Sequence, residues 1–315
     1  MQRHLSRAAA SLTSVFLGIA CQATVGCDGT AHAPLAPKFE AERAWQHLAK
    51  QVEFGPRPAG SEALERCRSY LEAELKSYGL VPKRETFKES TPAGEIEFTN
   101  VYADFAGSDP AAEMIVVGSH YDTKRMTFPF VGANDGGSST AVLLEIARVV
   151  AGSGKRAFSY RFVFFDGEEA VRPDWLDPDN TYGSRHHAAG LKRTGDVSKV
   201  RAFVLLDMIG DKELRLTRDT YSDKRMYDAF ERVARENGLG VHFEGKSMEL
   251  RDDHDSFMAI GVPSIDLIDF EYGPRNAWWH TADDTLDKCS KESLGAMGKI
   301  TLLGLVELEG MLSRK

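Results

Sequence analysis

Cysteine is scarce in this chain: only 4 of its 315 residues are cysteines. Cys21 and Cys27 fall in the N-terminal segment, which leaves Cys67 and Cys289 for the rest of the sequence. Two cysteines far apart cannot form a disulfide framework, although a single Cys67–Cys289 disulfide stays open. The same scarcity excludes a metal site built from cysteine thiolates.

Basic clusters and long apolar runs are also missing. The formal net charge is -8, and no run of Lys and Arg suggests the basic face that a nucleic-acid groove normally needs. Nucleic acid and anionic membranes are therefore not expected as partners. The sequence is nevertheless 42% hydrophobic and 27% charged, which is ordinary for a globular protein with a large core.

The N-terminus has the pattern of an export signal. Arg3 and Arg7 supply positive charge, residues 8–20 form a short and weakly apolar segment, and residues 31–33 (AHA) offer a cleavage point. The apolar segment is too short and too polar to span a bilayer. Residues 1–33 are therefore predicted to be a leader, and the protein to be exported to a periplasm or secreted.

Two variants of this leader stay open. Either a plain signal peptide is cleaved, or Cys21 or Cys27 becomes the anchor of a lipoprotein. Residues 34–40 resemble a flexible tether. Residues 41–315 contain no repeat, low-complexity run or long linker, so they are expected to form one domain.

Segments of helical and strand-like pattern alternate along this domain. Ser61 is expected to cap a helix that Gly79 ends. The segments with helical spacing are residues 39–54, 61–79, 136–152, 222–238 and 290–312. The apolar runs typical of strands buried on both faces are residues 113–120, 160–167, 201–210 and 261–270, and a half-exposed strand is predicted at residues 95–105. This alternation predicts an α/β fold: a single-domain, three-layer αβα sandwich around a central, mostly parallel mixed sheet.

Acidic and imidazole side chains follow the predicted strands. In open α/β sheets, ligands bind beyond the carboxyl ends of the strands, where these side chains would meet. Such groups suit zinc better than metals that prefer sulfur. In the stretch FVFFDGEEA, one glutamate of the pair can hold a metal while the other moves protons. The residues at these positions are His120, Asp122, Asp135, Glu168, Glu169, Asp207 and His280.

Each of these side chains alone also has a structural interpretation. Asp135 alone could cap a helix, His120 alone could be structural, and the pair Glu168 and Glu169 could form a solvated turn. Asp122, two residues after His120, is placed to orient the imidazole. Because all these groups lie at one edge of the inferred sheet, the combined pattern favours a metal site with a general base.

Six motifs along the chain together resemble one known family. They are, in order, GSHYD, GANDGGSS, DGEEA, LLDMIG, DDH and WHTADDTLD, and they extend over roughly residues 41–312. The ordered set is similar to that of the zinc exopeptidase family, which unites bacterial aminopeptidases with animal-type glutaminyl cyclases. The resemblance implies that Asp135, Glu169 and His280 are the primary zinc ligands and that Glu168 is the general base and acid.

The resemblance also bears on the number of metal ions. His120 and Asp207 match the ligands of a second zinc ion in the aminopeptidases. The cyclases retain these two residues but bind a single zinc ion, so the residues alone leave the count open.

Some features resemble the cyclase branch in particular. Trp175 follows the glutamate pair, and Trp279 directly precedes His280. Asp252 stands where cyclases have an acid that hydrogen-bonds to the equivalent of Asp207. The resemblance therefore implies Trp175 and Trp279 as substrate-binding residues, and Asp207 and Asp252 as catalytic residues beside the general base.

The sequence departs from the animal cyclases at several positions. Ser119 and Thr140 occupy the places of the disulfide near the active site of the animal enzymes. Arg275 stands where an aromatic residue is expected before the zinc-ligand histidine. These departures concern the shape of the substrate pocket and leave the metal-binding positions intact.

The resemblance implies a zinc-dependent glutaminyl-peptide cyclotransferase, which converts the N-terminal glutamine of peptides to pyroglutamate and releases ammonia. The alternative is a zinc aminopeptidase that hydrolyses N-terminal residues with one or two zinc ions. Peptide or protein N-termini are the expected substrates in both cases. A non-catalytic binding module of the same fold is a weaker alternative, because such relatives usually lose metal ligands, and here every ligand position is filled.

Overall fold

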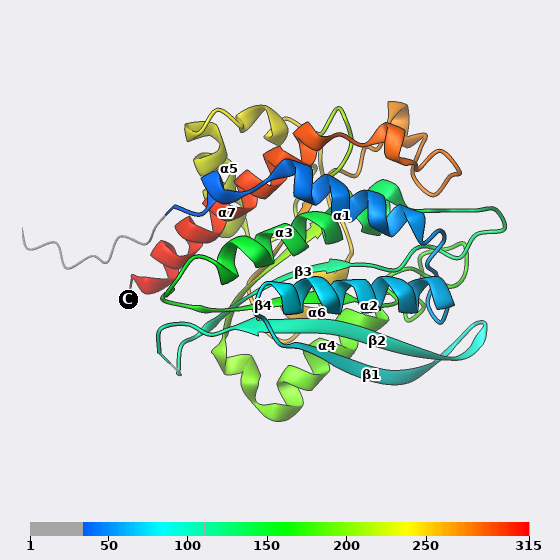
Figure 1. The fold of residues 1–315 in the computed structure, drawn as a ribbon, viewed down its shortest axis with the longest axis horizontal. Helices are drawn as coiled ribbons and strands as arrows, with labels where there is room; N and C mark the ends of the chain where they lie inside the picture. Colours follow the sequence, from blue (N-terminus) through cyan, green and yellow to red (C-terminus); the bar gives the residue numbers. More distant parts are fainter. Residues whose placement is uncertain (1–33, 110, 315) are drawn as a thin grey trace, which may run out of the picture. The chain divides into compact units, whose positions relative to one another are not determined.

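A mixed sheet forms the centre of the fold (Figure 1). The computed structural model describes residues 34–109 and 111–314. Within these residues the main sheet has six strands in the order β1-β2-β4-β3-β5-β8. Their bounds are β1 Pro82–Thr91, β2 Gly94–Phe105, β3 Met114–His120, β4 Ser159–Phe165, β5 Val200–Asp207 and β8 Ser264–Ile268. Two short strands, β6 (Arg218–Asp219) and β7 (Ser247–Met248), pair separately.

The sheet is mostly parallel. Strands β4, β3, β5 and β8 run parallel to one another, whereas β1 pairs antiparallel with β2, and β2 pairs antiparallel with β4. Strand β3 ends at His120 and β5 ends at Asp207, and the register pairs His120 with Phe165 at the end of β4. Because parallel neighbours end at the same edge, the residues after these strands share one side of the sheet.

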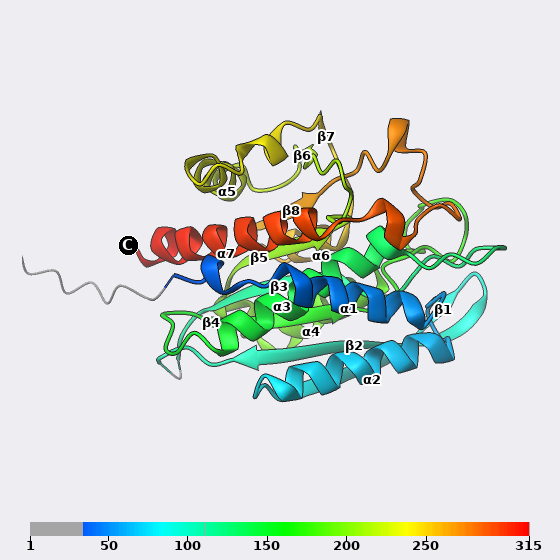
Figure 2. The ribbon, with the colours of Figure 1, turned by 45° about the horizontal axis from the view of Figure 1, so that its top comes forward.

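Helices cover both faces of the sheet (Figures 1 and 2). The larger apolar core lies between one face and α1, α2, α3, α5 and α7, and the smaller core lies between the opposite face and α4 and α6. The helix bounds are α1 Ala41–Glu53, α2 Glu62–Ser77, α3 Ser139–Ala151, α4 Tyr182–Thr194, α5 Lys224–Glu236, α6 Asp253–Met258 and α7 Lys291–Ser313. The predicted three-layer α/β architecture is confirmed.

The predicted helices and strands with strong apolar patterns are all present within a few residues of their expected ends. Ser61 caps α2, because its Oγ accepts a hydrogen bond from the backbone N–H of Leu64 at 3.1 Å. Gly79 follows α2 with φ of 81°, a left-handed conformation that glycine adopts at little cost at a helix end.

The elements that sequence analysis did not predict have weak apolar patterns. β1 is a largely exposed edge strand, and only Phe87 and Thr91 on it are buried. α4 combines two histidines and two glycines with few large apolar residues, and α6 has only six residues. Their positions depend on tertiary contacts, with β1 paired along its whole length to β2.

The structure differs from the expectation of a tether at residues 34–40. Leu35 and Phe39 are buried in the larger core, and the backbone N–H of Glu40 donates to Glu145 Oε1 at 2.9 Å. A Cβ on Gly298 of α7 would lie 2.2 Å from the Phe39 ring, so the two segments pack closely. This part of the chain is therefore held against the domain.

The two cysteines of the described residues are both buried and not joined to each other. Cys67 lies in α2, and Cys289 forms an isolated β-bridge with Asp211. In the described ranges, no helix combines the length and apolar character needed to cross a membrane. The predicted leader and its candidate lipid anchors, Cys21 and Cys27, lie outside the described residues.

Candidate metal and catalytic site

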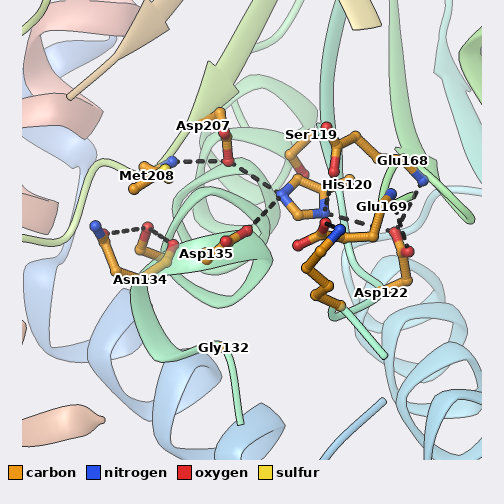
Figure 3. A network of polar contacts seen from close by, with 12 residues as sticks. Ser119, His120, Asp122, Gly132, Asn134, Asp135, Glu168, Glu169, Asp207 and Met208 are labelled. Atoms are coloured by element: carbon orange, nitrogen blue, oxygen red, sulfur yellow. Dashed lines mark hydrogen bonds and ion pairs between the residues drawn. The ribbon is translucent and has the colours of Figure 1, made fainter. Parts of the chain in front are cut away.

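His120, at the end of β3, lies at the centre of a group of carboxylates (Figure 3). Its Nε2 is 3.1 Å from Asp207 Oδ1 and 3.4 Å from Asp135 Oδ1. Its Nδ1 is 3.5 Å from Asp122 Oδ1 and 3.6 Å from Glu168 Oε2. Burial alone would lower the pKa of His120, but Glu168 and Asp207 outweigh it and raise the pKa well above its ordinary value.

Asp135 lies between two groups of side chains. It sits in an irregular segment, Ala133–Ser138, where its own backbone is extended (φ -78°, ψ 107°). Its Oδ1 faces His120, and its Oδ2 is 3.3 Å from Nε2 of His280. Burial would raise the pKa of Asp135, but the neighbouring imidazoles of His120 and His280 outweigh it and lower the pKa below its ordinary range. One carboxylate thus serves both groups.

Glu169 and His280 complete the second group. His280 Nε2 lies 3.2 Å from Glu169 Oε1, and the imidazole stacks on Trp279 with ring centroids 4.0 Å apart. The rings of Phe130 and His280 are nearly perpendicular, with ring centroids 6.0 Å apart. His280 has a φ of 53°, a strained backbone conformation of the kind that concentrates at functional sites.

These side chains fit a divalent cation. Two sets of three have ligand atoms within 4.8 Å of one another: His120, Asp135 and Asp207, and Asp135, Glu169 and His280. Among the described atoms, the buried Asp135 Oδ2 and His120 Nδ1 have no hydrogen-bond partner. Nearby Glu169 and Asp135 outweigh burial and raise the pKa of His280 to about 9. A cation would replace the protons that these imidazoles otherwise hold between carboxylates.

Glu168 belongs to neither of these ligand sets. Its backbone N–H and that of Glu169 donate to the two oxygens of Asp122 at 3.2 and 3.4 Å, which fixes the turn after β4. Its side chain is 7% exposed and lines a cavity beside the candidate metal site. Burial raises the pKa of Glu168 well above its ordinary value, although the positive field of His120 opposes this. Such a carboxyl is suited to proton transfer.

Asp207 and Asp252 also line this cavity. Asp207 Oδ1 accepts a hydrogen bond from the N–H of Met208, whose φ of 48° turns the chain sharply after β5. Asp252 caps α6 by accepting from the N–H of Asp253. Burial raises the pKa of Asp207, and burial with the fields of Asp207 and Asp253 raises that of Asp252 well above its ordinary value.

The cavity has a volume of about 290 Å³ and an aromatic rim. Trp175, Phe270 and Trp279 contribute to its walls, together with the carboxylates of both ligand sets. Trp278 points elsewhere, because it packs edge-on against Tyr272 and over Gly273. Of the two neighbouring tryptophans, Trp279 therefore lies at the site.

Three buried residues of the site escaped sequence analysis. Lys124 Nζ lies 3.3 Å from Glu169 Oε2. One oxygen of Glu169 therefore faces the ammonium group of Lys124, and the other faces His280. Asp284 accepts from the backbone N–H groups of Asn134 and Asp135 at 2.7 and 3.1 Å, with Tyr272 as a third donor. Only Asp284 carried a signal, since it lies in the motif WHTADDTLD.

Arg57 is the third of these residues. It is fully buried and donates to the carbonyl oxygens of Val131 at 2.8 Å and Gly132 at 3.3 Å, just before the Asp135 segment. It also donates to the carbonyl oxygen of Gln51 in α1. The loop carrying Asp135 is thereby fastened to the first helix. A lone arginine in the loop FGPRPAG gives no indication of these partners.

Gly136 gives a first testable prediction. Its φ is +77°, and a Cβ here would lie 2.6 Å from the carbonyl oxygen of Asp122 and 3.0 Å from Cε1 of His120. Gly136→Ala should destabilise the fold by about 1–3 kcal/mol and weaken metal binding, measured by denaturant unfolding and metal content. Gly152→Ala, at a position with ordinary φ and no close contact, is the control. Wild-type stability and metal content in Gly136→Ala would contradict this reading.

The fold and the clustered side chains define an α/β protein with a candidate metal centre at the carboxyl edge of its parallel strands. Comparison with known proteins then identifies its family. The chain belongs to Peptidase family M28, whose profile matches residues 100–304. This agrees with the family that the ordered motifs resemble.

Individual relatives are similar over most of the chain. A glutaminyl-peptide cyclotransferase-like protein from Bos taurus is 30% identical over 304 residues, covering 87% of this chain and 77% of the relative. The crystal structure of an Acidobacteriales bacterium glutaminyl cyclase has a TM-score of 0.83 and 33% identity, covering 87% of this chain and 96% of that one.

A third relative has a different description. The structure of a Zn-dependent exopeptidase from Parabacteroides distasonis has a TM-score of 0.76 and 26% identity, covering 85% of this chain and 98% of that one. The similar proteins thus include glutaminyl cyclases and an exopeptidase. The chain is an enzyme of this family.

Proposed function

We propose that this chain is a zinc-dependent glutaminyl-peptide cyclotransferase, which converts the N-terminal glutamine of peptides to pyroglutamate and releases ammonia. The observation that carries the proposal is a small, aromatic-walled cavity next to a buried glutamate outside both ligand sets. Its volume of about 290 Å³ lies at the lower end for ligand pockets, roughly 300–1,000 Å³, and suits a single side chain.

Asp135, Glu169 and His280 would hold one zinc ion. Zinc binds imidazole nitrogen and carboxylate oxygen, and three protein ligands at a catalytic zinc leave a fourth position for substrate. When bound, zinc supplies Lewis-acid polarisation of the side-chain amide oxygen. Lys124, beside the second oxygen of Glu169, compensates part of the negative charge of the ligand set.

Glu168 is the proton carrier in this proposal. Its carboxylate accepts a proton from the α-amine as the α-nitrogen forms a bond to the side-chain amide carbon. The bond from that carbon to the amide nitrogen breaks, and Glu168 delivers the proton to the departing nitrogen, which leaves as ammonia. Because the nucleophile and the amide belong to one residue, the enzyme mainly selects the folded-back conformation.

The remaining residues of the cavity orient the substrate. Asp207 and Asp252 accept hydrogen bonds from the amide nitrogen while it departs. Trp175 and Trp279 contact the aliphatic part of the glutamine side chain and exclude water, which would otherwise compete with the α-amine. Trp279 also holds the ring of His280 by stacking on it.

A second candidate function is that of an aminopeptidase. Asp135 belongs to both ligand sets, so the chain has the residues for a second zinc ion at His120 and Asp207. In that case Glu168 would take a proton from the attacking water. The Parabacteroides distasonis relative, described as a Zn-dependent exopeptidase, supports this alternative.

A paired peptide assay separates the two functions. The zinc-loaded protein is incubated with a peptide that begins with glutamine and with one that begins with leucine. We expect ammonia release and a matching loss of mass from the first peptide, with the second unchanged and one zinc ion per chain. Free leucine together with two zinc ions per chain would replace the cyclase proposal by the aminopeptidase.

A further inference from the structure

A second cavity adjoins the candidate site. Its volume is about 540 Å³, and it shares Trp175, Arg251 and Asp252 with the walls of the site cavity. The loop that follows Trp175 forms one side, and residues from Arg251 to Ala259, around α6, form the other. None of the residues assigned to metal binding or to proton transfer in either candidate reaction lines this second cavity, whereas Trp175 and Asp252, which are assigned to contacts with the substrate, line both cavities.

The walls of this cavity offer both apolar surface and hydrogen-bond donors. Leu176, which is 65% exposed, and Ala259 supply apolar surface to it. Asn180 is 2% exposed, and its Nδ2 has no hydrogen-bond partner among the described residues. Arg251 uses Nε for Asp255, and its guanidinium lies 5.1 Å from the centre of the Tyr221 ring. These walls therefore match a peptide segment with an apolar side chain and carbonyl oxygens.

The loop that forms the cavity is fastened to the candidate general base. The carboxylate of Asp179 accepts from the backbone N–H groups of Val171 and Arg172 and from the hydroxyl of Tyr182. The N–H of Thr181 donates to the carbonyl oxygen of Glu168 at 2.8 Å. The second cavity and Glu168 therefore keep a fixed relative position, as a binding subsite requires.

We propose that the second cavity binds the second and third residues of a peptide substrate whose first residue occupies the site cavity. The inference deepens the proposed function and rests on it only in taking a peptide as substrate. The two cavities share Trp175, Arg251 and Asp252, so a substrate that extends past its first residue can pass directly from the site cavity into the second cavity. A bulky apolar second residue packs against Leu176 and Ala259, and Arg251 or Asn180 donates to a carbonyl oxygen.

The test compares short and long ligands in the zinc-loaded full chain. Dissociation constants of glutamine amide and of Gln-Leu-Leu amide are measured in Glu168→Gln, which is expected to bind both without converting them. We expect the longer ligand to bind about tenfold more tightly, which corresponds to about 1.4 kcal/mol. Ala259→Trp, added to this background, fills the cavity and should reduce that ratio to nearly one.

Two further variants distinguish blocking of the second cavity from a general loss of ligand binding. Ala73→Trp places the same side chain on an exposed position of α2, outside both cavities, and should retain the tenfold ratio. Leu176→Ser, at an exposed position, should remove most of the preference for Gln-Leu-Leu amide over Gln-Ser-Ser amide. The inference is overturned if folded Ala259→Trp keeps the tenfold ratio of Glu168→Gln. It is also overturned if Glu168→Gln itself binds glutamine amide and Gln-Leu-Leu amide equally well.

The proposed function is read out separately in the same experiment. Ammonia release from glutamine amide by the wild-type protein reports on the cyclase reaction, whereas the ratio of dissociation constants reports on the second cavity. No ammonia with an intact ratio would reject the reaction and keep the subsite. Ammonia with a ratio of one would keep the reaction and reject the subsite.

Discussion

Glu168→Gln should lower kcat by about 10²–10⁴-fold, the usual contribution of a general acid–base group, while the zinc content stays at the wild-type level. The substitution keeps the size of the side chain and the turn that Asp122 fixes through backbone N–H groups. It removes the carboxylate that accepts the proton in either candidate reaction. Steady-state kinetics with metal analysis of the same samples tests the prediction.

The matched control is Glu249→Gln. Glu249 also lines the site cavity, but its residue is exposed at the rim, so water screens its charge. We expect the kcat of Glu249→Gln to fall far less than the kcat of Glu168→Gln. Retained turnover in Glu168→Gln would remove Glu168 from the proton-transfer role, and loss of zinc would make it a ligand instead.

Much of the candidate site follows from the order of residues along the chain. His120 and Asp207 end two strands whose apolar runs are unmistakable, and Glu168 follows a third. Once these strands are parallel neighbours, their carboxyl ends must meet at one edge. His280 lies well beyond the end of β8 at Ile268, so the strand pattern places it less directly than the others, and the resemblance of the motif WHTADDTLD implied its role as a ligand.

Other features depend on contacts between distant segments that no local pattern contains. Arg57 reaches the carbonyl oxygens before Asp135, and Lys124 faces Glu169 across 45 positions of sequence. Whether Trp278 or Trp279 enters the cavity depends on the backbone turn before His280, which a local pattern does not fix. Residues 34–40 contain two prolines and no helical or strand-like pattern, yet Leu35 and Phe39 among them are buried in the larger core, and this segment contacts α7.

The shared position of Asp135 explains why one site suits two reactions. One of its oxygens faces each imidazole, so the residue can complete a single centre or bridge two. The candidate general base lies beside both groups in either case. In the proposed function, the choice between an internal amine and an external water as nucleophile would then fall to the cavity, whose walls include Trp175 and Trp279.

Zinc removal should lower the stability of the folded protein substantially. A ligand that binds only the folded state adds about 4 kcal/mol at a free concentration 1,000-fold above its dissociation constant. Without a cation, Asp135 and Glu169 rely on His280, His120 and Lys124 to balance their buried charge. Thermal unfolding before and after chelation, followed by zinc addition, measures the difference.

Asp135→Asn and Asp252→Asn connect this stability to the proposed ligands. Asparagine has nearly the size of aspartate, so Asp135→Asn should fold but bind zinc far more weakly, and chelation should then shift its unfolding temperature little. Asp252→Asn changes a buried carboxylate of the same cavity that belongs to neither ligand set, and it should keep both the zinc and the response to chelation. If the two variants bind zinc equally well, the cation does not lie where Asp135 joins the two sets.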